Sequence, residues 1–181
     1  GPGIRAIRGR HISMIFQEPM VSLSPLHTIG DQVSEALFLH HKVSHKEGME
    51  RTQDMLRLVG FPNPARALRN YPFELSGRLR QRAMIAMALV ARPSLLIADE
   101  PTTALDVTIQ AQILALLDEL QAEMHMALLF ITHDLNLVRR FTHRVGVMER
   151  GKLVEVGATR TVFDQPQHVI GHDRRRPLDR F

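Results

Sequence analysis

The sequence predicts an α/β fold: a largely parallel β-sheet flanked by helices, with a small helical insertion. Apolar runs of strand type alternate with helical patterns along the chain; the strands are expected at 11–16, 95–98 and 127–131, and the helices at 76–91 and 107–125. A strand–helix–strand order requires crossover connections, which make the strands parallel. Ligands bind such sheets at the carboxyl ends of the strands.

A helical block of about residues 21–91 separates the first strand from the rest of the predicted sheet. Residues 28–40 carry apolar side chains at helical spacing. Ser44, with Glu47 three residues later, has the pattern of a capping box, and Gly60 is the expected end of the helix that Ser44 begins. This block is therefore interpreted as an insertion of helices into the α/β domain.

The chain after residue 131 is predicted to form a helix at 135–141 and a hairpin. The hairpin strands, at 144–148 and 152–156, flank Glu149, Arg150 and Gly151. We expect one domain over 1–168, followed by a divergent tail at 169–181 whose composition is typical of a solvated segment.

The composition excludes several classes of function. The 181 residues contain no cysteine, which rules out disulfides, thiolate zinc sites and thiol nucleophiles within them. The net charge of +4 comes largely from four arginines in the last eight residues, so a nucleic-acid partner is not expected. No secretory signal and no apolar run of membrane-spanning length is visible.

Two consecutive carboxylates end the predicted strand at 95–98. Asp99 and Glu100 point in different directions because side chains alternate along a strand, so they suit different tasks. One carboxylate can hold Mg²⁺ beside nucleotide phosphates, and the other can orient an attacking water. The alternative is an acidic turn that caps the next helix.

Three further places carry polar residues that could bind a ligand: two follow predicted strands and one opens a helix. Gln17 follows the first strand and His133 follows the strand at 127–131. Ser76 and Gly77 open a helix, whose free backbone N–H groups can bind an anion. Taken singly, Ser76 is better explained as a helix N-cap and His133 as a surface cap.

In this order, these motifs resemble the ATP-binding-cassette (ABC) ATPases, whose domains have a P-loop-NTPase-like sheet with a helical insertion. Gln17 resembles the Q-loop, Leu75-Ser76-Gly77 with Gln81-Arg82 the signature, and residues 95–100 the Walker B strand with its catalytic glutamate. Ala104-Leu105-Asp106 resembles the D-loop and His133 the switch histidine. The stretches at 16–20, 98–107 and 130–135 are similar to the oligopeptide and dipeptide importer branch.

The resemblance, which covers about residues 4–168, implies the cofactors ATP and Mg²⁺ and a role for each residue. Asp99 and Gln17 would contact Mg²⁺, and Glu100 would be the general base. Gln17 would also sense the γ-phosphate, and His133 would contact the γ-phosphate and stabilise the transition state. Ser76, Gly77, Gln81 and Asp106 would serve the nucleotide and the interface of a head-to-tail pair of domains.

The resemblance also implies a function and a location. The chain would power peptide uptake from the cytoplasmic face of the inner membrane, where residues 21–72 would touch transmembrane permease subunits. A soluble ABC-type ATPase acting on nucleic acid is an alternative, but the chain shows no sustained heptad run.

The sequence departs from the family in three places. No G-x-x-x-x-G-K-S/T phosphate-binding loop occurs, Arg78 replaces the second glycine of the signature, and the pattern fades after His168. In the family that loop precedes the Q-loop, so we expect the chain to be an N-terminally truncated domain that does not bind or hydrolyse ATP alone. A non-catalytic remnant is therefore the second hypothesis.

Overall fold

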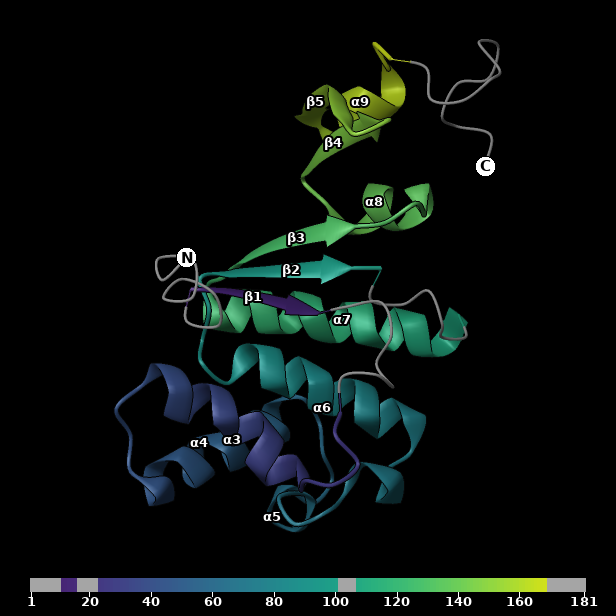
Figure 1. Cartoon of the computed structure of the whole chain (residues 1–181). Helices are drawn as coiled ribbons and strands as arrows, with labels where there is room; N and C mark the ends of the chain where they lie inside the picture. Colours follow the sequence, from purple (N-terminus) through teal and green to yellow (C-terminus); the bar gives the residue numbers. More distant parts are fainter. Residues whose placement is uncertain (1–10, 16–22, 101–106, 169–181) are drawn as a thin grey trace. The chain divides into compact units, whose positions relative to one another are not determined.

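The computed structural model describes residues 11–15, 23–100 and 107–168 (Figure 1). The chain divides into two compact units, one ending at Ile131 and the other beginning at Thr132.

A three-stranded parallel sheet forms the centre of the first unit. Its strands are β1 (Ile12–Ile15), β2 (Leu95–Asp99) and β3 (Ala127–Ile131), and β2 lies between the other two. The register pairs Ile12 with Leu95 and Leu95 with Ala127, so all three strands end at the same edge. The prediction of a parallel sheet in an α/β fold is confirmed.

The two faces of this sheet differ in burial. Ile15 and Leu96 are buried in one apolar core with residues of helices α6 (Gly77–Leu89) and α7 (Val107–Met124). The opposite face carries Met14, Leu129 and Ile131, which are exposed. Figure 1 shows α6 and α7 on the same side of the strands.

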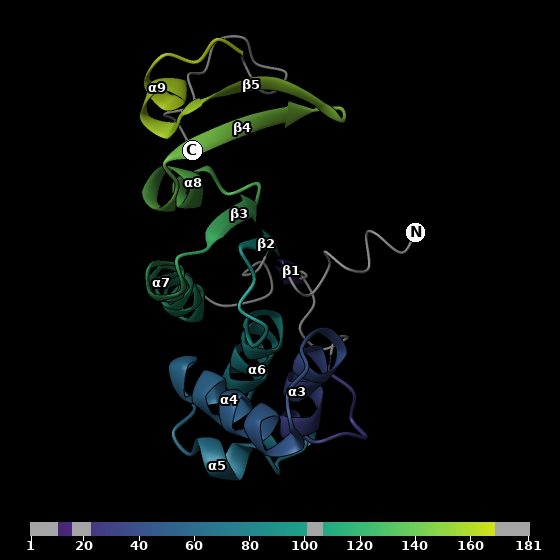
Figure 2. The same cartoon turned by 90° about the vertical axis from the view of Figure 1, so that its left-hand side faces the viewer.

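The predicted insertion is a bundle of helices, seen from a second direction in Figure 2. It contains α3 (Ile29–His40), α4 (His45–Leu58), the short α5 (Pro64–Ala67) and the 3₁₀ turn η1 (Pro72–Glu74), and it packs on α6. Thr28, Ser44 and Ser76 are side-chain N-caps of α3, α4 and α6. Gly60 follows α4 with φ +85°, a left-handed conformation that glycine adopts without strain.

The loop after α5 is tied to the start of α3 by backbone hydrogen bonds. The N–H of Ile29 donates to the carbonyl of Asn70 at 2.8 Å, and that of Gly30 to the carbonyl of Leu68 at 3.0 Å. A Cβ added at Gly30 would lie 2.6 Å from the Leu68 oxygen, so a side chain there would push the two segments apart.

The second unit contains the predicted helix and hairpin. Helix α8 (Leu135–Phe141) precedes the antiparallel strands β4 (Arg144–Glu149) and β5 (Lys152–Ala158), and α9 (Thr159–Asp164) follows them. The divergent tail lies outside the described residues. Within the described part of the chain, no helix is both long and apolar enough to cross a membrane.

Candidate functional site

Asp99 and Glu100 lie at the carboxyl end of the central strand. Asp99 is the last residue of β2 and pairs with Ile131, the last residue of β3. Both acidic side chains are partly exposed, whereas the neighbouring Ala98 is buried. The structure therefore places two adjacent carboxylates at the sheet edge where parallel sheets bind ligands.

The backbone at Glu100 is in an unusual conformation. Its φ is +46°, in the left-handed region that costs a non-glycine residue about 1–2 kcal/mol. The N–H of Glu100 donates to the carbonyl of Ile131 at 2.8 Å, which holds this conformation against β3. Strained residues of this kind concentrate at functional sites, where the surrounding structure fixes the direction of the side chain.

Ser76 and Gly77 form an exposed start to α6. The Ser76 hydroxyl accepts a hydrogen bond from the N–H of Leu79 at 3.3 Å, which is N-cap geometry. Apart from its chain neighbours and the backbone of α6 itself, no atom of the described residues lies within 4 Å of the position that a Cβ on Gly77 would take, so the described part of the chain leaves the first turn open to an approaching group. Its free backbone N–H groups suit an anion.

Arg78 and Gln81 occupy different environments on α6. Arg78, in the first helical turn, is exposed, and a cation at this end opposes the helix dipole. Gln81 is only 1% exposed and lies among the core side chains of the same helix. Gln81 is thus separated from the open surface that Ser76 and Gly77 share, and its nucleotide contact stays a prediction.

Arg82 anchors the signature helix to the insertion. One guanidinium nitrogen donates to the carbonyls of Val59 at 2.5 Å and Gly60 at 3.3 Å, at the end of α4. Partial burial, and then the charge of Arg78, lower the pKa of Arg82 from its usual value. The sequence analysis identified Gly60 as the end of a helix but did not predict its contact with Arg82.

The turn before the signature is closed by Glu74. Its carboxylate accepts a hydrogen bond from the N–H of Tyr71 at 2.7 Å. This bond, and then one to the Asn70 side chain, hold the pKa of Glu74 below its usual value. Arg80 of α6 donates from Nε to the carbonyl of Pro72 at 2.8 Å, which joins α6 to η1.

His133 lies in the second unit, directly before the N-cap of α8. That cap is Asp134, whose carboxylate accepts from the N–H groups of Asn136 and Leu137. The His133 side chain is exposed. The structure therefore brings Asp99 and Glu100 together in one unit and places His133 in the other.

Two predicted site residues, Gln17 and Asp106, lie outside the described residues. Their roles at the Q-loop and at the domain interface remain predictions.

Residues 3–103 match the ABC transporter family. This match covers more than half of the chain. The chain belongs to the ABC transporter family. The resemblance drawn from the motifs is thus confirmed.

The curated relatives of this ABC chain are named as transport ATP-binding proteins. It is 58% identical over 166 residues to the peptidoglycan transport ATP-binding protein YejF of Agrobacterium fabrum, a match that covers 92% of the chain and 30% of that protein. It is 53% identical to the dipeptide transport ATP-binding protein DppD of Bacillus subtilis, covering 91% of the chain and 49% of that protein. The chain thus spans less than half the length of these two relatives.

Solved structures of ABC ATPases share the fold. The cassette MJ0796, solved as a dimer in a post-hydrolysis state bound to ADP and phosphate, is 30% identical with a TM-score of 0.73. That match covers 88% of this chain and 67% of MJ0796. CbiO1 of Clostridium perfringens is 28% identical with a TM-score of 0.76, covering 91% of this chain and 62% of cbiO1.

The residues at the end of β2 fit the magnesium and nucleotide that this family uses. Mg²⁺ prefers oxygen ligands and is bound through one or two carboxylates together with substrate phosphates. The partly exposed Asp99 at a strand end supplies such a carboxylate without a complete cage of protein ligands. The adjacent Glu100 is a second carboxylate at the same strand end, of the kind that can act as a general base.

Proposed function

We propose that this chain supplies the hydrolytic part of an ATP-binding subunit that powers peptide uptake. The observation that carries the proposal is the Asp99–Glu100 pair at the carboxyl end of β2, in a chain of the ABC family. One relative is named a dipeptide transport protein and the other a peptidoglycan transport protein, and both names support peptides as the class of cargo. The site of action would be the cytoplasmic face of the inner membrane.

In this proposal each carboxylate has one task. Asp99 holds Mg²⁺, which offsets the negative charge of the phosphates when it is bound. Glu100 accepts a proton from the water that attacks the γ-phosphate, and the fixed backbone at Glu100 aims the carboxylate. His133 donates to the γ-phosphate, and Gln17 contacts the metal and reports the state of the phosphate to the helical insertion.

A second domain would complete the site. Ser76 and Gly77 would present the open start of α6 to the nucleotide bound on a partner domain, in a head-to-tail pair with Asp106 at the interface. The dimeric solved structure of MJ0796 supports this arrangement.

We place the contact with permease subunits on an apolar patch, which we define as Leu26, Tyr71 and Phe73. Leu26 is 80% and Phe73 69% exposed, and the Tyr71 and Phe73 rings stack at 5.7 Å between centroids. The hydrogen bond between Ile29 and Asn70 holds the two segments of this patch together. Exposed aromatic residues are enriched at protein interfaces.

We test this patch with Phe73→Ser in the complete transporter. Removing the aromatic side chain should detach the ATP-binding subunit from the permease and abolish transport. Co-purification with the permease measures the first effect. Unchanged co-purification would remove the patch from the proposal.

We further propose that the 181-residue chain alone does not hydrolyse ATP. It contains no G-x-x-x-x-G-K-S/T sequence, whose backbone N–H groups and lysine cradle the phosphates. The chain would then be active only together with a polypeptide that supplies this loop. A non-catalytic remnant is the competing proposal, and intact Asp99, Glu100 and His133 speak against it.

The test is a hybrid in which the 166 matched residues of this chain replace their counterparts in the Agrobacterium fabrum relative. We expect the hybrid to hydrolyse Mg-ATP. Glu100→Gln should lower kcat by about 10²–10⁴-fold, the contribution of a general base. Glu119→Gln, the same change at an exposed position on α7, is the matched control and should have no effect.

The alternatives give different results. A hybrid without ATPase activity would favour the remnant. An active hybrid in which Glu100→Gln and Glu119→Gln behave alike would show that Glu100 is not the base.

A further inference from the structure

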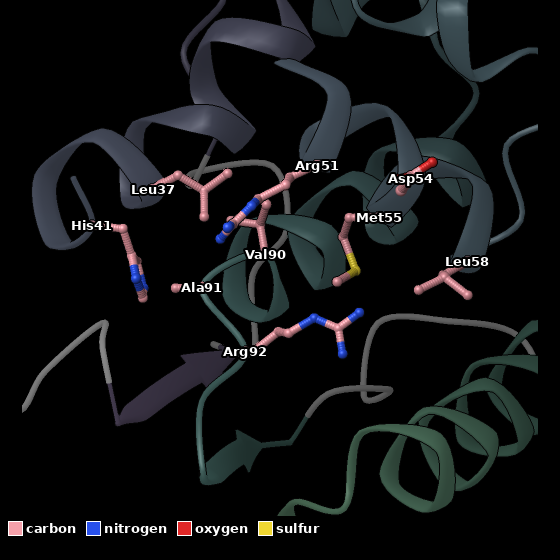
Figure 3. A pocket seen from close by; sticks show the side chains of 9 residues that line it. All are labelled: Leu37, His41, Arg51, Asp54, Met55, Leu58, Val90, Ala91 and Arg92. Atoms are coloured by element: carbon pink, nitrogen blue, oxygen red, sulfur yellow. The ribbon is translucent and has the colours of Figure 1, made fainter. Parts of the chain in front are cut away.

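A cavity of about 260 Å³ lies inside the helical part of the first unit, apart from the sheet edge that carries Asp99 and Glu100. It lies between the end of α3, the middle of α4 and the turn that joins α6 to β2 (Figure 3). Apolar side chains make up much of its lining: Leu37, Met55, Leu58, Val90 and Ala91. Its volume is close to the lower end of small-molecule sites, about 300 Å³.

Two arginines line this cavity, and neither forms an ion pair with a carboxylate of the lining. Arg92 follows α6, and its guanidinium makes no hydrogen bond or ion pair with any described residue. Arg51 uses one nitrogen for Glu47, at 2.6 Å, and a guanidinium has further N–H donors. The carboxylate that also lines the cavity, Asp54, is occupied by Arg57, which is itself not part of the lining.

The polar groups lie on opposite sides of the apolar lining. Figure 3 shows the imidazole of His41 and the guanidinium of Arg92 on either side of Val90. The Nε2 atom of His41 is buried and has no hydrogen-bond partner among the described residues. His41 also lines the cavity, and an imidazole nitrogen can donate or accept a hydrogen bond.

We propose that this cavity binds a small organic dianion, with a carboxylate at each end of a short aliphatic chain. One carboxylate accepts hydrogen bonds from Arg92, and the other from Arg51 and His41. The aliphatic chain lies against Val90, Ala91 and Met55. A ligand with a single carboxylate leaves one end of the cavity without its counter-charge, and so binds less tightly.

The test measures binding of adipate to the full 181-residue chain by calorimetry at fixed ionic strength. Hexanoate, with one carboxylate, and 1,6-hexanediol, with none, have chains of the same length. We expect the dissociation constant of adipate to be about tenfold lower than that of hexanoate, as one charge-assisted hydrogen-bonded contact predicts. Hexanediol should bind most weakly.

Four variants locate the site. Arg92→Asn removes the cation but keeps a residue that tolerates φ of +50°, and should erase the advantage of adipate over hexanoate. Arg51→Gln should do the same from the other end. Ala91→Met should fill the cavity and weaken all three probes. Arg150→Asn, at another positive-φ arginine that does not line the cavity, should leave binding unchanged.

Three outcomes would overturn the proposal: absence of adipate binding, equal affinity for adipate and hexanoate, or an equal loss in Arg92→Asn and Arg150→Asn. Melting curves of each variant verify that the chain is folded. The proposed ATPase function is independent of this site, because none of the four substitutions touches the end of β2.

Discussion

Glu100, the proposed general base, has a strained backbone conformation. This residue has a left-handed φ of +46°, and its N–H is held by the carbonyl of Ile131. The residue that follows Ile131 begins the second unit and leads directly to His133. The end of β3 therefore fixes Glu100 and begins the segment that carries His133.

The strain at Glu100 gives a prediction for stability. Glu100→Gly and Glu100→Ala both remove the carboxylate, but only glycine adopts this φ without cost. We expect Glu100→Gly to unfold with a free energy about 1 kcal/mol higher than Glu100→Ala, measured by urea denaturation. A less stable glycine variant would show that the left-handed conformation is not strained.

Arg78 gives a prediction for activity. A side chain at this position adds bulk beside the open start of α6, where the family pattern has a glycine. In the hybrid described above, Arg78→Gly should raise kcat/KM for ATP by about tenfold, or about 1.4 kcal/mol of transition-state stabilisation. Unchanged or lower kcat/KM would mean that Arg78 turns away from the phosphate, or that its charge assists binding.

The sequence predicted where the two candidate carboxylates lie, but not their backbone geometry. The positions of Asp99 and Glu100 at a strand end follow from the apolar run before them. The left-handed φ of Glu100 does not, because it depends on a hydrogen bond to a residue 31 positions later. The sequence analysis gave no burial for Gln81, which is 1% exposed in the structure.

The helices and strands with strong local sequence signals lie where the sequence predicted them. Ser44 caps α4 and Gly60 ends it, and β3 spans 127–131 as predicted. Two short helices were not predicted: α5 has four residues and α9 has six, too few to show a helical period. Val162 and Phe163 of α9 are buried, so tertiary packing supports that helix.

The contact between α4 and α6 depends on Arg82, and it can be tested by substitution. Arg82→Met keeps much of the side-chain volume but removes the donor to the Val59 and Gly60 carbonyls. The free energy of unfolding should fall by about 1 kcal/mol, the value of a typical hydrogen bond.

The matched control is Arg69→Met, at an exposed arginine outside this contact. Its denaturation midpoint should stay close to that of the parent. Equal destabilisation by both substitutions would indicate a general loss of charge and not the loss of a helix anchor.

The whole chain carries the residues proposed here for hydrolysis, but no G-x-x-x-x-G-K-S/T sequence. Asp99 and Glu100 sit at a sheet edge built from β1, β2 and β3, and one face of this sheet leaves Met14, Leu129 and Ile131 exposed. Fold class and family were predictable because they rest on several motifs in order. The separation into two compact units was not, because it depends on contacts between distant parts of the chain.

The most direct test of this account is ATP hydrolysis by the purified 181-residue chain with Mg²⁺. We predict no turnover above background and no rise in melting temperature at millimolar Mg-ATP, because the loop that cradles the phosphates is absent from the sequence. Turnover that disappears in Glu100→Gln would contradict the account, since it would require a phosphate site within these residues that the motifs do not reveal.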